Sequence, residues 1–168
     1  LLTSLASLFF ISNYIHGQSK SKEDLGNSLV ASILNDDISS FKSLLLPKHV
    51  ALEFQKNTDF ENTDQQERDS LMAEYENTYD SMVIPRYEKK FRIIVNINES
   101  YEIDWSTLNF MILYKGSSIE DEYIPFFIHT KLNNSDYNHF YFDSVRYKGE
   151  WFLSGNIEIT KDEKYAPK

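Results

Sequence analysis

The chain contains no cysteine. That absence excludes disulfide bonds, thiolate metal sites, a thiol nucleophile and a lipid-modified cysteine. It does not fix the compartment, because many exported proteins also lack cysteine. Positive charge is scarce as well, since 17 Lys and Arg residues stand against 26 Asp and Glu residues and give a formal net charge of −9. The phosphate backbone of a nucleic acid repels such a surface, so we expect no nucleic-acid partner.

Long apolar runs are absent beyond the N-terminus, so we expect no membrane span in the mature chain. Residues 1–15 are apolar and uncharged, and a charged stretch begins soon after Gly17. This pattern predicts a secretory signal peptide over residues 1–18, with its basic n-region missing and its cleavage site near Gly17 or Gln18. A buried N-terminal helix and an uncleaved anchor are the alternatives. The expected location is periplasmic or extracellular, and the protein is not expected to be a lipoprotein.

What remains after the leader is expected to fold as one domain. The 168 residues are 41% hydrophobic and 15% aromatic, which is enough to build a sizeable buried core. No Gly-rich or Pro-rich linker and no internal repeat divides the chain. We therefore predict a single domain over residues 19–162, followed by a polar tail over residues 163–168.

The first half of this domain has the apolar spacing of helices. A helix is predicted over residues 22–34, with Ser21 as its N-cap. Asp36 and Asp37 end it and cap a short second helix, which Pro47 closes. Residues 48–62 are interpreted as a polar connection.

A longer helix is predicted from about residue 64, capped by Thr63. Pro85 should break or kink it, and a second segment should continue to about residue 99. The part of this helix before Pro85 is expected to bury one apolar stripe, which consists of Leu71, Met72, Tyr75, Tyr79, Met82 and Val83.

The second half of the chain predicts four strands, at about residues 107–114, 123–132, 139–147 and 151–159. Lys148 and Gly149 form a two-residue hairpin turn between the last two strands. Pro125 suggests an edge position for the second strand. Helices first and strands afterwards predict an α+β fold, with N-terminal helices packed on one face of a curved, mainly four-stranded antiparallel sheet.

The hairpin turn also predicts the register of the last two strands. Tyr147 should face Glu150, Val145 should face Phe152, and Asp143 should face Ser154, all on one side of the sheet. The other side is more apolar and should face the helices; it carries Phe140, Phe142, Ser144, Arg146, Trp151, Leu153, Gly155, Ile157 and Ile159. Asp143 and His129 then point away from the helices, which leaves the helix-facing side almost without groups for acid–base chemistry.

The polar groups expected at a cavity or its rim are Ser144, Arg146, Trp151, Thr130 and Tyr114. Arg146 lies opposite Trp151, which predicts a cation–π contact at the hairpin end. On the outward side stand Tyr141, Tyr147 and Phe152. These three either form an exposed aromatic patch for a partner or pack beneath a loop or the C-terminal tail.

No motif assigns a metal, a cofactor or a catalytic residue. No two of the four histidines have the helical spacing of a metal site, although His129 and His139 lie on neighbouring strands and could approach each other. Phosphate-binding glycine loops, a serine elbow, a dinucleotide fingerprint and a calcium loop are all missing.

Two stretches carry a resemblance to a known family. Residues 35–41 (NDDISSF) resemble the junction between its first two helices, and residues 142–153 (FDSVRYKGEWFL) resemble its closing strands. The family is the nuclear-transport-factor-2-like superfamily, also called SnoaL-like or cystatin-like, and the chain is similar to secreted bacterial proteins of unknown function that carry such a domain. The resemblance implies a cone of curved sheet closed by helices, often with a cavity in which family enzymes place Asp, His or Tyr. It leaves a homodimer through the sheet face open.

These observations favour an exported, non-catalytic binding domain. Its partner would be a small hydrophobic molecule, a glycan or a protein. The alternative is a small enzyme of the isomerase or dehydratase type. That enzyme would need a cavity carboxylate or histidine, and a one-residue register shift would supply Asp143, with His129 as the second candidate. A structural factor of the cell envelope is a third possibility.

Overall fold

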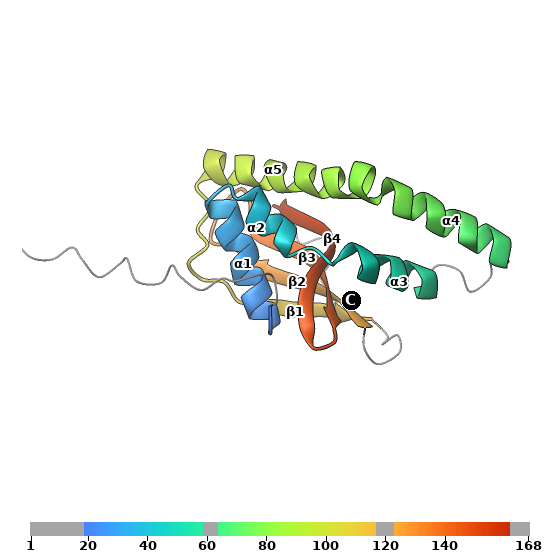
Figure 1. Cartoon of the computed structure of the whole chain (residues 1–168). Helices are drawn as coiled ribbons and strands as arrows, with labels where there is room; N and C mark the ends of the chain where they lie inside the picture. Colours follow the sequence, from blue (N-terminus) through green and yellow to red (C-terminus); the bar gives the residue numbers. More distant parts are fainter. Residues whose placement is uncertain (1–18, 59–63, 117–122, 162–168) are drawn as a thin grey trace, which may run out of the picture.

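A computed structural model describes residues 19–58, 64–116 and 123–161, and its fold is α+β as predicted (Figure 1). Helices occupy the first part of the chain, and a four-stranded antiparallel sheet follows them. The predicted signal peptide over residues 1–18, the cap at Thr63 and the tail over residues 163–168 lie outside the described residues. None of the described helices has the length and apolar character needed to cross a membrane.

The first two helices begin at the predicted caps. Helix α1 (Lys22–Leu34) starts after Ser21, whose side chain accepts the Asp24 backbone N–H at 3.0 Å. Helix α2 (Ile38–Ser43) starts after Asp37, whose carboxylate accepts the backbone N–H groups of Ser39 and Ser40. Side-chain oxygens at these positions satisfy the first N–H groups of a helix, which have no partner within the helix itself.

The polar connection predicted over residues 48–62 is wrong, because helix α3 (Lys48–Thr58) occupies most of it. The Pro47 carbonyl accepts the N–H groups of Val50 and Ala51, both at 2.9 Å. Proline is favoured at the beginning of a helix, where its missing N–H costs no hydrogen bond. Pro47 therefore starts α3 as well as closing the stretch before it, and Val50 is buried.

The predicted break at Pro85 takes the form of a π-helical turn. Helix α4 (Gln65–Thr78), the π turn η1 (Tyr79–Val83) and helix α5 (Ile84–Tyr101) follow one another as a continuous rod (Figure 1). Pro85 lies in the first turn of α5. Because a proline ring clashes with the carbonyl four residues earlier, a wider turn relieves the contact without ending the helix.

The buried stripe predicted along this rod is wrong for Leu71 and Met82, whereas Tyr75 and Val83 are half-buried and pack against a core that contains Val145 and Phe152. Leu71 is 41% exposed and Met82 is 65% exposed, and Tyr79 is the only one of the six that is buried. Helix α4 extends beyond the end of the sheet, where no strand lies under it (Figure 1). Its cap is Asp64, whose carboxylate accepts the Glu67 N–H at 2.9 Å.

The sheet is a meander of the strands β1 (Met111–Lys115), β2 (Tyr123–Lys131), β3 (His139–Tyr147) and β4 (Glu150–Thr160), in that order. The edge position predicted from Pro125 is wrong, since β2 lies between β1 and β3. The Pro125 carbonyl accepts the Gly116 N–H at 2.9 Å. The N and O atoms of one strand residue point to the same side, so the missing N–H of Pro125 falls where β1 ends rather than toward β3.

The closing hairpin confirms the predicted turn. Lys148 has φ 49° and Gly149 has φ 85°, which is the pattern of a two-residue type I′ turn. Tyr147 pairs with Glu150, Arg146 with Trp151 and Val145 with Phe152, as expected.

Farther along the hairpin, β4 bulges. The register passes from Ser144–Leu153 to Phe142–Ile157, so two extra residues of β4 lie in the bulge. The predicted pairing of Asp143 with Ser154 is therefore wrong. The Asp143 carboxylate instead accepts the Asn156 backbone N–H at 2.8 Å.

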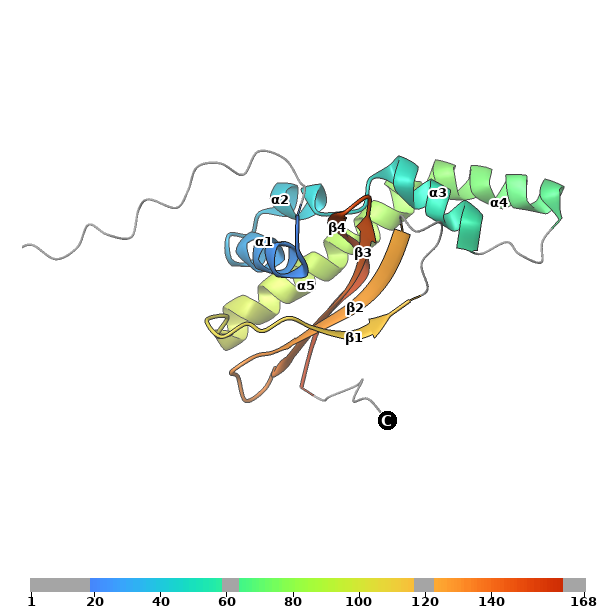
Figure 2. The ribbon, with the colours of Figure 1, turned by 90° about the horizontal axis from the view of Figure 1, so that it is seen from below.

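Both faces of the sheet are covered. The predicted helix-facing side packs on α1, α2 and α5 in one core that includes Phe91, Phe140 and Phe142. A second core lies on the other side and joins Val50 and Tyr79 to Tyr123, Val145 and Phe152. The expectation that the helices pack on one face alone is wrong, because α3 and the π turn cover the hairpin end of the opposite face. Figure 2 shows α1 and α2 toward one end of α5 and α3 and α4 toward the other.

Candidate functional site

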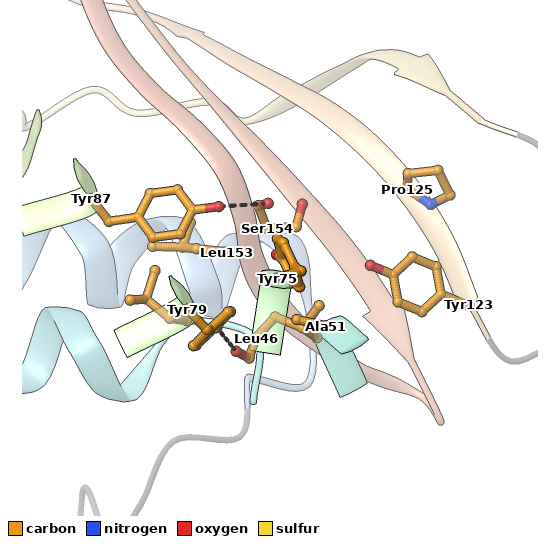
Figure 3. A pocket seen from close by; sticks show the side chains of 10 residues that line it. Leu46, Ala51, Tyr75, Tyr79, Tyr87, Tyr123, Pro125, Leu153 and Ser154 are labelled. Atoms are coloured by element: carbon orange, nitrogen blue, oxygen red, sulfur yellow. Dashed lines mark hydrogen bonds between the residues drawn. The ribbon is translucent and has the colours of Figure 1, made fainter. Parts of the chain in front are cut away.

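A pocket of about 130 Å³ lies where the π turn, α3 and α5 meet the strands (Figure 3). Tyrosines from four different elements converge on it. They come from α4, the π turn, α5 and the first position of β2: Tyr75, Tyr79, Tyr87 and Tyr123. The rest of the described lining is mainly apolar: Leu45, Leu46, Ala51, Pro125, Leu153 and Ser154.

The π turn aligns the tyrosines of the rod. An α-helix advances by about 100° per residue, so the eight residues from Tyr79 to Tyr87 would leave their side chains about 80° apart. A π turn inserts one extra residue, which cancels about 100° and brings the two side chains to within about 20° of the same direction. Tyr75 lies one turn before Tyr79, and their rings meet edge to face with centroids 5.9 Å apart. The π turn over Tyr79–Val83, just before Pro85, is thus the reason that Tyr87 faces the pocket.

Backbone carbonyls fix the hydroxyls of two of these tyrosines. The Tyr79 hydroxyl donates to the Leu46 carbonyl at 3.1 Å, and the Tyr87 hydroxyl donates to the Ser154 carbonyl at 3.1 Å (Figure 3). The Leu46 N–H in turn donates to the Leu153 carbonyl at 2.9 Å, which fastens this segment to the edge of β4. With their protons engaged, both phenol oxygens face any ligand as hydrogen-bond acceptors.

Burial keeps these phenols neutral. Loss of solvent raises the pKa of Tyr79 to about 12 and that of Tyr87 to about 12. Burial also raises the pKa of Tyr123. A phenolate is costly away from water, so at neutral pH the pocket presents uncharged rings.

Formal charges lie beside the pocket but not in its described lining. The Lys48 ammonium is 5.8 Å from the centroid of the Tyr79 ring and forms an ion pair with Asp80 at 2.7 Å. The Asp143 carboxylate lies close enough to Tyr87 to contribute to the raised pKa of that phenol. Its own pKa is raised by burial, while the Asn156 N–H and the Lys90 ammonium oppose that shift.

None of the five predicted cavity or rim residues lines this pocket. Ser144 and Thr130 are fully buried on the helix-facing side, where the Thr130 hydroxyl accepts the Asn109 N–H at 3.0 Å. Trp151 is also buried, whereas Arg146 is exposed and Tyr114, on β1, is 64% exposed.

The cation–π contact predicted between Arg146 and Trp151 is not formed. The two residues are register partners across the hairpin, but the described cation–π contacts involve Lys48 and Lys148 instead. The Trp151 ring packs against Phe126, with centroids 4.5 Å apart. The indole is therefore part of the core beneath the hairpin, while the guanidinium is in solvent.

The two alternative catalytic residues occupy separate surroundings. His129 is only 2% exposed, and its Nε2 lies 3.0 Å from Nδ1 of His139, so the predicted approach of these two histidines is confirmed. The His129 ring also stacks on Tyr141, with centroids 4.6 Å apart. Asp143 is half-buried against the β4 bulge. Neither residue belongs to the described lining of the tyrosine pocket, and no three His, Asp or Glu side chains within residues 19–58, 64–116 and 123–161 gather as a metal site requires.

Tyr141, Tyr147 and Phe152 do not form an exposed aromatic patch, so that alternative is wrong. Tyr141 is fully buried, Phe152 is buried and Tyr147 is half-buried. Phe152 packs in the second core with Leu46 and Val50, beneath α3 and the segment before it.

Sequence reasoning did not find the tyrosine pocket. The helical spacing predicts Tyr75 and Tyr79 as ordinary core positions of a helix. The available signal was the recurrence of tyrosine on both sides of Pro85. Reading it as a site requires the π turn and the position of α3, neither of which the sequence pattern specified.

Comparison of the chain with protein-family models, with curated proteins and with solved structures found no match in any of the three.

Proposed function

We propose that this protein is a non-catalytic binding domain that takes a small molecule into the tyrosine pocket. The observation that carries the proposal is the convergence of four tyrosines from four elements on one cavity, with a π turn needed to bring Tyr87 into line. Concave sites lined by aromatic groups with a few fixed polar atoms are typical ligand sites, and π turns are frequent at functional positions.

The chemistry of the lining favours binding over catalysis. Tyr79 and Tyr87 have pKa values of about 12, so neither phenol exchanges its proton readily at neutral pH. Asp143 is not among the described residues that line the pocket, and its carboxylate accepts a hydrogen bond from the Asn156 backbone N–H. The pocket volume of about 130 Å³ also favours a small molecule over a glycan or a protein segment, because drug-sized ligands occupy roughly 300 Å³ or more.

Filling the pocket tests the proposal. Ala51 lines the cavity, so Ala51→Leu should occupy part of it, whereas Ala31→Leu places the same side chain on an exposed face of α1. The full chain and both variants are screened against a mixture of small fragments by ligand-observed NMR. We expect hits that the Ala51→Leu variant loses and the Ala31→Leu variant keeps. A fragment set that binds all three proteins equally, or none of them, would contradict the proposal.

Export is part of the same proposal and rests on the sequence of residues 1–18. Mass spectrometry of the protein recovered outside the cytoplasm should give an N-terminus near Ser19. Recovery of the uncleaved chain from the cytoplasm alone would contradict it.

A further inference from the structure

We infer that the ligand of the tyrosine pocket is a small alkylammonium cation, with a methylated ammonium group held against the tyrosine rings. This inference rests on the proposed function, because it names the class of small molecule that the pocket binds. It does not depend on any residue outside the described part of the chain.

The hydrogen bonds of Tyr79 and Tyr87 disfavour an anion beside these two side chains. The hydroxyl protons of Tyr79 and Tyr87 are already given to the carbonyls of Leu46 and Ser154. Their oxygens can therefore only accept hydrogen bonds from a ligand. A carboxylate or phosphate would place its own acceptors against these acceptors. An ammonium group, by contrast, brings N–H donors or polarised methyl groups.

The rings themselves favour a cation. The face of a phenol carries negative charge density, and a cation within about 6 Å of the ring centroid is attracted to it. Tyr79 already shows this behaviour on one side, where the Lys48 ammonium lies 5.8 Å from its centroid. No Lys or Arg is among the described residues that line the pocket, so Lys48, beside Tyr79, is the cation that a ligand would meet there, and it is itself paired with Asp80.

The net negative charge of the protein also favours a cation over an anion. Two carboxylates lie near the pocket, and each has a cationic neighbour: Asp80 is paired with Lys48, and Asp143, which contributes to the raised pKa of Tyr87, lies near Lys90. The chain as a whole carries a formal charge of −9. An excess of negative charge raises the local concentration of cations and repels anions.

The size of the pocket limits the ligand to a compact head group. A cavity of about 150 Å³ accommodates one benzene ring, and this pocket has about 130 Å³. Tetramethylammonium and the head of choline are of that order of size. Because the side chains that surround the pocket come from packed helices and strands, a free small cation fits better than a lipid that must also bury its chains.

The experiment is an NMR titration of the full chain with three probes. Tetramethylammonium and choline carry the charge, and 3,3-dimethyl-1-butanol is the uncharged carbon analogue of choline. We expect both cations to bind at least roughly tenfold more tightly than the alcohol, because a desolvated cation–π contact is worth that much. Tyr79→Leu should weaken choline binding roughly tenfold, and Tyr114→Leu, on exposed β1, should leave it unchanged.

The outcomes separate the inference of a cationic ligand from the proposed binding function of the pocket. Equal binding of choline and its uncharged analogue would overturn the cation inference and leave the binding function standing. If the pocket binds fragments that the Ala51→Leu variant loses, but binds neither cation, the cation inference is likewise overturned and the binding function stands. Binding of phosphatidylcholine vesicles without free choline would overturn the assignment to a free small molecule. If Tyr79→Leu does not fold, Tyr75→Leu on the half-exposed side of the pocket gives the same test.

Discussion

The hydroxyl of Tyr87 on α5 donates a hydrogen bond to the carbonyl of Ser154 in the β4 bulge, with the two oxygens 3.1 Å apart. This bond joins the helical rod to the irregular part of the last strand. A regular ladder would direct that carbonyl along the sheet, whereas the bulge leaves it for a side chain. The contact holds one wall of the pocket, and its removal is the simplest perturbation of the site.

Tyr87→Phe should destabilise the protein by about 1 kcal/mol, because the partly buried Ser154 carbonyl loses its partner while the ring remains in place. For a chain of this length that free energy corresponds to a fall in Tm of roughly 2–4 °C. Circular-dichroism melting of the variant measures it. Tyr114→Phe, whose hydroxyl is on an exposed strand, is the matched control and should melt with the unmodified protein. Equal melting of both variants would show that the contact contributes nothing.

Alkaline titration should separate the buried tyrosines from the others. Burial raises the pKa of Tyr79 and of Tyr87 to about 12, above the usual tyrosine value of 10.0. A raised phenol pKa means that the folded state holds its proton longer. The associated stability is therefore present below pH 10 and is lost as the pH rises through 12. We expect the tyrosinate absorbance to rise in two phases, and Tyr79→Phe to reduce the later one. A single phase in the folded protein would contradict the assignment.

Asp143→Asn should stabilise the protein at neutral pH. Burial raises the pKa of the Asp143 carboxyl, against the opposing Asn156 N–H bond and the Lys90 charge. Such a group favours folding most below its unfolded pKa near 4, and its contribution is lost as the pH rises through the folded value. The amide keeps an oxygen for the Asn156 N–H and needs no charge.

Melting curves from pH 3 to pH 8 should therefore show a gain for Asp143→Asn near neutrality that disappears in acid. Asp69→Asn, on the exposed face of α4, is the control for removal of one negative charge. A gain of the same size in both variants would assign the effect to net charge rather than to burial.

Gly26→Ala should reverse the usual effect of that substitution in a helix. Alanine normally stabilises a helix interior by about 1 kcal/mol relative to glycine. At position 26, however, the added Cβ would lie 2.4 Å from Cζ of the buried Phe110 ring. Overpacking of this kind costs about 1–3 kcal/mol. Denaturant unfolding of Gly26→Ala should show a net loss, whereas Asn27→Ala on the exposed face should show none; a stabilised Gly26→Ala variant would refute this packing argument.

The parts of the fold that could be predicted from the sequence are those with local causes. Ser21 and Asp37 offer side-chain oxygens at helix starts, and both cap the helices that were expected. Lys148 and Gly149 form the expected turn, and the turn fixes the pairing of Val145 with Phe152. These outcomes depend on a few neighbouring residues, so a pattern in one sequence is enough to predict them.

Features caused by packing between distant segments were not predictable in the same way. The rod contains Pro85, and the sequence alone does not decide between a break, a kink and a π turn. Pro125 predicts an edge strand, but β2 is an inner strand that tolerates this proline because β1 ends next to it. The bulge that carries Ser154 also contains Gly155, and a glycine within a strand is a signal for a bulge. Its two extra residues are held by Asp143 and by the neighbouring helix α5, which the sequence pattern does not show.

From the sequence alone follow the succession of helices and then four strands, except for α3, as well as the caps of α1 and α2, the last hairpin and the apolar side of the sheet. They do so because backbone hydrogen bonding and side-chain alternation are local. Only the tertiary structure decided that α3 and the π turn cover the opposite side of the sheet, and that four tyrosines surround one pocket there. That arrangement depends on the angular shift of a single helical turn and on contacts between segments far apart in the chain, such as Tyr79 with Leu46.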